Sequence, residues 1–292
     1  MRRIRSLFLP LLMLALCACQ PPRPQVAPST PDDDVVPLSA PITVVTLNLG
    51  HDRQDWPRRQ QAILDVLQDL DPDVVLLQDV LQDRGLPNQT QGLAEALGYR
   101  WQYRFYSTDP QAQPRRHGNA VLTRYRIVGV GQRALQPLDD ARSAGFARLD
   151  IGGRPLNVYV THLHEAQDGA IRQRQVEDLM DFVAATREGA PSLIGGDFNT
   201  GDDAAELQSL TAGYDSAASA HAGDAAALAA PMRNPQTGRP PQRTSHLFIQ
   251  RGAFRVQESR IVSDQQDAEA VRAPDYAAVM AKLQSLAWLP ER

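Results

Sequence analysis

Four short hydrophobic runs, each followed at once by polar residues, constrain the fold of this chain more than any other feature. The runs are residues 42–47, 73–77, 156–160 and 192–194. The polar residues that follow them are Asn48, then Gln78 and Asp79, then Thr161, His162 and His164, and finally Asp197 and Asn199. Because β-rich apolar runs of this length are typical of buried strands, the pattern predicts one polar site assembled from strand ends at the edge of a sheet.

The fourth run continues through Gly195 and Gly196 to Asp197 and Asn199. A carboxylate and an amide two residues apart on an extended chain point to the same side, and their oxygens suit a hard cation or a phosphate group. We interpret the run as a buried strand that breaks at the two glycines and delivers both polar residues at its end. Gly-Gly-Asp is also an ordinary turn sequence, and the run alone does not decide between the two interpretations.

Apolar residues at helical spacing predict two long helices. They are Ile63, Val66, Leu67 and Leu70 within residues 56–70, and Val176, Leu179, Met180 and Val183 between His162 and Ser192. Residues 101–106, 119–123 and 146–151 are further predicted strands, and the alanine-rich residues 217–230 predict a short helix. Strands that alternate with two long helices predict an α/β fold of two packed mixed sheets covered by helices.

Several short motifs occur in a fixed order along the chain. They are Thr46-Leu47-Asn48-Leu49, Leu77-Gln78-Asp79, Gly118-Asn119-Ala120, Thr161-His162-Leu163 and Gly196-Asp197-Phe198-Asn199. In this order, over residues 41–283, they resemble the motifs of the endonuclease/exonuclease/phosphatase superfamily, the DNase I-like metal-dependent phosphoesterases. The resemblance implies a four-layer α/β/β/α sandwich of two mixed sheets, a phosphate-ester substrate, and Mg²⁺ or Mn²⁺ as cofactor.

The resemblance also implies a role for each matching residue. Asn48, Asp79 and Asp275 would hold the metal, with Asp79 one methylene shorter than the family's glutamate. The catalytic residues would be His162, Asp197, Asn199 and, in place of a histidine, Tyr276. Asn119 and His164 would line the substrate site. Three ordinary alternatives remain open, namely that Asp79 caps a turn, that Asn119 is a turn residue before a strand, and that His164 is a satisfied structural neighbour.

Two departures from the family pattern concern a catalytic His–Asp pair. Ser245, in the run of residues 243–248, occupies the position of an aspartate that orients the histidine. The terminal S-D-H motif has two competing registers, Asp275 with Tyr276, which we prefer, and Asp264 with Gln265, and neither contains a histidine. We therefore expect a weak phosphodiesterase with a degenerate active site. The alternative is a non-catalytic binding lipoprotein that uses the same pocket.

The N-terminal residues have the features of a bacterial lipoprotein signal. Three arginines precede a short apolar stretch, and residues 16–19 resemble a site that is cleaved before Cys19 and lipidated on its sulfur. This pattern predicts a signal peptide (1–18), a Pro-rich tether (19–40), the catalytic-type domain (41–285), a C-terminal tail (286–292) and attachment to the outer membrane, facing the periplasm or the cell surface. The alternative is an ordinary secretory signal.

Charge bears on the partners of the domain. The formal net charge of the chain is -4, and removal of Arg2, Arg3 and Arg5 with the signal makes it -7. An acidic balance argues against nucleic acid as a general partner, because such binding depends on neutralising phosphates. The basic residues of residues 115–126 are interpreted as a solvated loop with its flanks. We favour a monomer.

Overall fold

A computed structural model describes residues 40–50, 55–98, 100–220, 243–262 and 278–286, all within the unit Val36–Arg292. The sequence predictions at Cys19, Asp264, Gln265, Asp275 and Tyr276, and those for the signal and the tether, lie outside the described residues. None of the helices in these described ranges is long and apolar enough to span a membrane.

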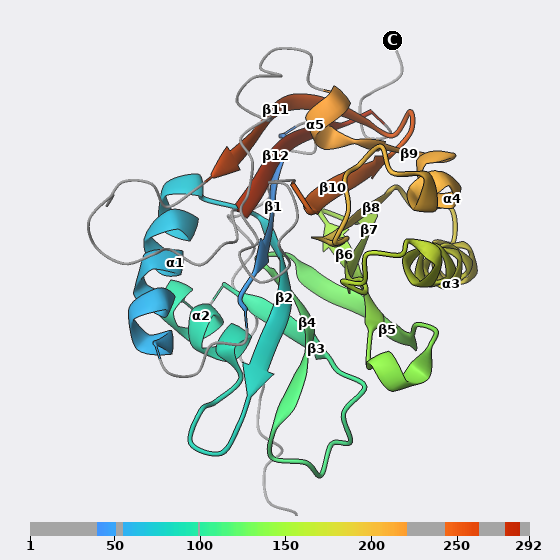
Figure 1. The fold of residues 1–292 in the computed structure, drawn as a ribbon. Helices are drawn as coiled ribbons and strands as arrows, with labels where there is room; N and C mark the ends of the chain where they lie inside the picture. Colours follow the sequence, from blue (N-terminus) through green and yellow to red (C-terminus); the bar gives the residue numbers. More distant parts are fainter. Residues whose placement is uncertain (1–39, 51–54, 99, 221–242, 263–277, 287–292) are drawn as a thin grey trace, which may run out of the picture. The chain divides into compact units, whose positions relative to one another are not determined.

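The first of two six-stranded sheets has the strand order β11-β12-β1-β2-β4-β3 (Figure 1). Its strands are β1 (Ile42–Asn48), β2 (Val74–Gln82), β3 (Gln102–Tyr106), β4 (Arg116–Thr123), β11 (Phe254–Val262) and β12 (Ala278–Ser285). Its one parallel pair joins β1 to β2, and the register sets Asn48 beside Gln78. The polar residues that follow the first two hydrophobic runs therefore lie side by side.

The second sheet has the order β5-β6-β7-β8-β10-β9. Its strands are β5 (Arg126–Ala134), β6 (Ser143–Ile151), β7 (Arg154–His162), β8 (Ser192–Asp197), β9 (Tyr214–Ser216) and β10 (Ser245–Gln250). Here the parallel pair is β7 with β8, and its last partners are His162 and Asp197. Each sheet thus brings one pair of parallel strands to the site by their carboxyl ends.

The described helices are α1 (Trp56–Leu70), α2 (Gln89–Leu97), α3 (Ala170–Thr186), α4 (Gln208–Thr211) and α5 (Ala217–Ala220). Helices α1 and α2 cover the outer face of the first sheet, α3 and α4 cover that of the second, and α5 contacts β10 and β11, one strand of each sheet. One buried core holds inward-facing residues of both sheets, such as Val44 and Val158, a second lies between α1, α2 and the first sheet, and a third lies between α3, α4 and the second sheet. These three cores separate four layers, so the predicted α/β/β/α sandwich is confirmed.

Both long helices occur where the periodicity predicts them, with small differences in the buried face. In α1 the buried residues include Leu64, whereas Ile63 and Val66 are only partly buried. The nine-residue helix α2 was missed, although Asn88 caps it by accepting a hydrogen bond from the Thr90 amide at 3.0 Å. The short helix expected in residues 217–230 is observed as α5, and residues 221–230 lie outside the described part.

The two glycines before Asp197 do not break the strand, which corrects the sequence interpretation. β8 runs through Gly195 and Gly196 to Asp197, and all six of its residues are buried. A Cβ on Gly196 would lie 2.0 Å from the Thr161 carbonyl oxygen, and one on Gly195 would lie 2.4 Å from Leu76 Cδ1. The glycines are therefore required for close approach of neighbouring chain segments rather than for a turn.

Basic side chains within the range 115–126 form ion pairs and ring contacts with neighbouring residues of the fold. Arg124 pairs with Asp71 and lies over the Trp101 ring, and the exposed Arg126 pairs with Asp150 at 2.6 Å. These contacts agree with the interpretation as solvated flanks rather than as a free basic surface.

Candidate active site

A β-bulge aims Asp79 at the site. In the pairing of β2 with β4, Leu77 lies opposite Ala120 and Val80 opposite Gly118, so two residues of β2 face one residue of β4. Asp79 is the second of the two and has a left-handed backbone with φ of 52°. Bulges next to active sites commonly redirect a side chain in this way, and aspartate tolerates the left-handed region better than most residues.

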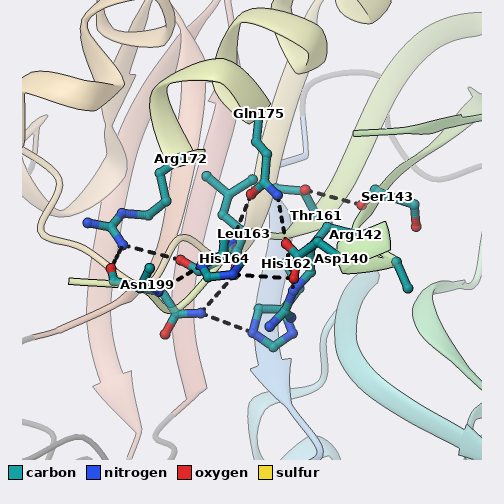
Figure 2. Close-up of polar contacts among 12 residues, drawn as sticks. Asp140, Arg142, Ser143, Thr161, His162, Leu163, His164, Arg172, Gln175 and Asn199 are labelled. Carbon is teal, nitrogen blue, oxygen red and sulfur yellow. Dashed lines mark hydrogen bonds and ion pairs between the residues drawn. The ribbon is translucent and has the colours of Figure 1, made fainter. Parts of the chain in front are cut away.

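His162, the last residue of β7, is held by both sheets. Its Nδ1 lies 2.9 Å from Asp79 Oδ1, and its Nε2 lies 3.2 Å from the Asn199 amide nitrogen (Figure 2 shows the second contact). An ionised carboxylate only accepts hydrogen bonds, so Nδ1 carries the hydrogen and Nε2 accepts one from Asn199. This assignment of the tautomer follows from the hydrogen-bond network.

Asn199 holds its position through local contacts. Its amide nitrogen also donates to the Leu163 carbonyl at 2.9 Å, and its backbone N–H donates to Asp197 Oδ1 at 3.0 Å. Its φ of 53° is left-handed, so Asp197 and Asn199 do not converge by lying on an extended chain. They converge because the chain turns tightly after β8 and the Asp197 carboxylate closes that turn.

Asp197 also joins the two sheets. Its Oδ2 accepts a hydrogen bond from the Asn48 side chain at 3.1 Å and lies 3.9 Å from His162 Nε2. Asn48 in turn uses its Oδ1 to accept the Gly50 amide at 2.8 Å. The structure therefore brings Asn48, Asp79, His162, Asp197 and Asn199 into one largely buried network, as the strand-end pattern predicts.

Ser245 lies on β10 beside this network. It pairs with Asp197 across β10 and β8, and it is fully buried. Its Oγ has no hydrogen-bond partner among the residues that the structure describes. Antiparallel partners present their side chains on the same face of a sheet, so a carboxylate at this position would face the carboxylate of Asp197.

The next residue, His246, is a structural histidine. Its Nε2 donates to the Thr200 carbonyl at 2.8 Å, and its ring packs against Phe198 and Phe248. Burial, helped by the nearby Arg243 guanidinium, lowers the pKa of His246 to about 4. The ring is therefore neutral near pH 7 and supports the turn after β8 rather than exchanging protons there.

His164 and Asn119 contact neighbouring segments of the chain rather than the network around His162. His164 Nε2 lies 3.5 Å from Asp140, and its Nδ1 accepts the Ala166 amide at 2.8 Å. β7 ends at His162, so the extended backbone that would place both histidines on one face is not maintained. The Asn119 amide donates to the Ser143 carbonyl at 3.0 Å, and Asn119 lies within β4 rather than in a turn.

The described residues include two of the three predicted metal ligands, Asn48 and Asp79. Within these ranges no group of three or more His, Cys, Asp and Glu side chains could hold a metal ion. Of the three predicted ligands, Asp79 bonds to His162, Asn48 bonds to Gly50 and Asp197, and Asp275 lies outside the described part.

A family model matches most of the chain. Residues 45–277 match the model described as the Endonuclease/Exonuclease/phosphatase family. The chain belongs to this family. The resemblance of the motifs is thus confirmed, and the network around His162 is a site on an endonuclease/exonuclease/phosphatase scaffold.

Two curated proteins are similar to this family member over part of their length. Protein angel of Drosophila melanogaster is 27% identical over 175 residues, which are 56% of this chain and 49% of that protein. The uncharacterized protein YbhP of Escherichia coli is 27% identical over 169 residues, 53% of this chain and 66% of that protein. The chain therefore spans about half to two thirds of the length of these relatives.

Three solved structures share the fold of this chain. Humanized TDP2 of D. rerio has a TM-score of 0.66 at 16% identity and covers 84% of this chain and 100% of its own. The catalytic domain of human Nocturnin with bound sulfate has a TM-score of 0.65 at 20% identity, with coverages of 86% and 96%. A family protein from Leptotrichia buccalis has a TM-score of 0.66 at 15% identity, with coverages of 83% and 99%. Identities this low show the fold alone.

Proposed function

We propose that this chain is a phosphoesterase, acting on a phosphodiester or phosphomonoester, in which His162 contacts the scissile phosphate. The observation that carries the proposal is the position of His162 between Asp79 of the first sheet and Asn199 after β8, at 2.9 and 3.2 Å. A histidine whose Nδ1 is held by a carboxylate has a fixed tautomer and directs Nε2 at a defined point, which is the arrangement that proton transfer and phosphate binding require.

The proposed chemistry uses the contact between His162 and Asn199. In the structure each of these side chains satisfies the other. A phosphate oxygen that enters between them takes a hydrogen bond from the Asn199 amide and, once Nε2 is protonated, a second one from His162. Both donors are then directed at oxygens on which negative charge builds in the transition state. Asp197 orients the two asparagines and is the candidate acceptor of a proton from the attacking water.

Members of this family commonly use Mg²⁺, and we propose Mg²⁺ or Mn²⁺ for this chain. A bound cation would neutralise charge on the phosphate. The described residues supply only Asn48 and Asp79 of the proposed ligands, so the site depends on Asp275 as well.

We further propose that turnover is weak because the catalytic His–Asp pair of the family is replaced by Tyr276 and Ser245. Tyrosine has a reference pKa near 10 and stays a neutral donor near pH 7, and the fully buried Ser245 has no carboxylate with which to orient a histidine. General acid-base assistance is typically worth about 10²- to 10⁴-fold in rate. The loss of one such pair leaves a scaffold that binds phosphate better than it hydrolyses it.

Turnover of bis(p-nitrophenyl) phosphate by the purified protein with Mg²⁺ or Mn²⁺ tests the proposal. We expect slow hydrolysis that His162→Ala lowers by about 10²-fold, the low end of acid-base assistance. His117→Ala is the matched control, because His117 is a partly exposed histidine beside Asp109. Turnover that His162→Ala leaves unchanged would contradict the role of His162. No turnover at all, with retained phosphate binding, would favour the binding lipoprotein.

We also propose that Cys19 carries a lipid that anchors the protein to the outer membrane. The support is the sequence of residues 16–19 after a short apolar stretch. Cys19→Ala is expected to move the protein out of the membrane fraction or to block its processing, and Cys17→Ala is the control. Normal cleavage with unchanged membrane retention in Cys19→Ala would remove the lipid anchor from the account.

A further inference from the structure

The buried face of α3 begins with two polar side chains. Arg172 is 3% exposed and Gln175 is fully buried, whereas the later residues of the same face are apolar, namely Val176, Leu179, Phe182 and Val183. A buried polar side chain is costly unless it is hydrogen-bonded, and a buried charge is more costly still. The partners of Arg172 and Gln175 therefore show why polar residues occupy these positions.

The two side chains hold the backbone of His164 from both sides (Figure 2). Gln175 Oε1 accepts a hydrogen bond from the His164 N–H at 2.8 Å, and Arg172 Nη1 donates to the His164 carbonyl at 3.2 Å. Arg172 Nη1 also donates to the Ala166 carbonyl. The segment that leaves the site after His162 is thus fixed by the first two turns of the helix that follows it.

This segment also makes hydrogen bonds to Asp197 and Asn199. Leu163 lies between His162 and His164, and its N–H donates to the Asp197 carbonyl at 2.9 Å. The Leu163 carbonyl accepts the Asn199 side-chain amide, also at 2.9 Å. A shift of the His164 peptide group would therefore move both His162 and the Asn199 side chain that faces it.

The same two side chains reach two further loops. Arg172 donates through Nε and Nη2 to Glu206 Oε1, at 3.1 and 2.8 Å, in the segment after β8. Gln175 Nε2 donates to Asp140 Oδ2 at 2.9 Å, in the loop between β5 and β6. Burial acts to raise the pKa of Glu206, but hydrogen bonds such as that from Arg172 outweigh it and leave the pKa lowered, so the ion pair stays charged.

We propose that Arg172 and Gln175 are positioning residues, which set the placement of His162 and Asn199 by fixing the His164 peptide groups and joining three loops to α3. The inference rests on the proposed function, because the residues that they position are those proposed to contact the phosphate. A misplacement of about 1 Å at an active site costs as much as 10²-fold in rate, so such a framework affects kcat without touching substrate.

Gln175→Glu tests one arm of this framework without a change of size. The glutamate keeps an oxygen for the His164 N–H, loses the donor to Asp140 and places two carboxylates against each other. For the full-length variant we expect kcat for bis(p-nitrophenyl) phosphate to fall about 10-fold or more, with a smaller change in KM. Adding Asp140→Asn to Gln175→Glu restores the hydrogen bond with its direction reversed, because the new asparagine amide donates to the new glutamate. We expect this double variant to recover most of the lost kcat.

Gln173→Glu is the matched control. Gln173 lies on the exposed face of the same helix and donates to the Glu177 carboxylate at 3.2 Å, so the change has the same chemistry in solvent. It is expected to leave kcat and KM unchanged. Arg172→Lys provides a second variant, since it keeps the charge beside Glu206 but lacks the planar fork that reaches two carbonyls and a carboxylate at once.

Two readouts do not depend on turnover. Amide hydrogen exchange of Leu163 and His164 is expected to quicken by about 10-fold in Gln175→Glu and Arg172→Lys, and the ¹⁵N shifts of the His162 ring are expected to change. Both should return toward wild type in the Asp140→Asn/Gln175→Glu variant. Unchanged exchange and ring shifts in the single variants, or a double variant no better than Gln175→Glu, would overturn the positioning role. If the wild type has no activity but the single variants still show faster exchange and altered ring shifts, only the proposed hydrolysis is refuted.

Discussion

At the scale of single residues, the site depends on two positions where the backbone is left-handed without a glycine. Asp79 has a φ of 52° and Asn199 a φ of 53°. Such a conformation costs roughly 1–2 kcal/mol for most residues, and aspartate and asparagine tolerate it best. Each turns a side chain toward His162 that a regular strand would direct elsewhere. The strain is thus located where the proposed chemistry takes place.

The identities of these residues could be predicted from the order of the motifs, but their contacts could not. The contact of Asp79 with His162 Nδ1, for example, arises because a bulge redirects the Asp79 side chain. A bulge depends on the pairing of β2 with β4, which no local sequence pattern records. Arg172 and Gln175 were missed as well, since a charged residue on an apolar helix face is ordinarily assigned to solvent. The available sequence signal was their spacing: Arg172 and Gln175 are three residues apart and fall on the same helix face as the apolar residues that follow.

At the scale of elements, the strands with clear alternation or buried runs and the long helices follow from hydrophobic periodicity, whereas shorter elements do not. Residues 56–70 form α1 as predicted, but the nine residues of α2 make too few turns for a repeat to stand out. The glycines of β8 were misassigned because the same residue permits both a turn and a close approach. Only the neighbouring strands decide which one applies.

Gly196→Ala tests the close approach directly. The new methyl group would lie 2.0 Å from the Thr161 carbonyl oxygen, so β7 and β8 must separate where His162 and Asp197 are paired. We expect the free energy of unfolding to fall by about 3 kcal/mol, as for severe overpacking. Gly213→Ala is the control, because nothing lies within 4 Å of its Cβ position, and it should stay within about 0.5 kcal/mol of wild type in chemical denaturation. Equal midpoints for the two variants would show that β8 accommodates a side chain.

At the scale of the whole domain, two sheets that each contain one parallel pair of strands build a single site. The contacts from Asn48 to Asp197 and from Asp79 to His162 both cross from one sheet to the other, at 3.1 and 2.9 Å. The alternation of strands and helices predicted this layered architecture, and the family match agrees with it. What sequence reasoning could not supply is the packing of one sheet on the other, which decides which strand ends meet.

We propose that this scaffold keeps the contact between Asp79 and His162 but has lost the catalytic His–Asp pair at the positions of Ser245 and Tyr276. Ser245→Asp alone buries a carboxylate opposite Asp197 and is expected to lower stability without raising activity, because like charges in contact disfavour ionisation. Tyr276→His alone restores a group that titrates near neutral pH, but Ser245 still stands in place of the aspartate that orients it in the family. Each change is therefore expected to act through the other.

Turnover of bis(p-nitrophenyl) phosphate by the double variant Ser245→Asp/Tyr276→His, with Mg²⁺ or Mn²⁺ present, measures whether the restored pair restores hydrolysis. We expect a rate on the order of 10²-fold above wild type, more than the two single variants together provide. Ser245→Asp/Gln265→His is the control for the alternative register and should give no gain. If the folded double variants of both registers bind phosphate but hydrolyse the substrate no faster than wild type, loss of the His–Asp pair is not what limits hydrolysis.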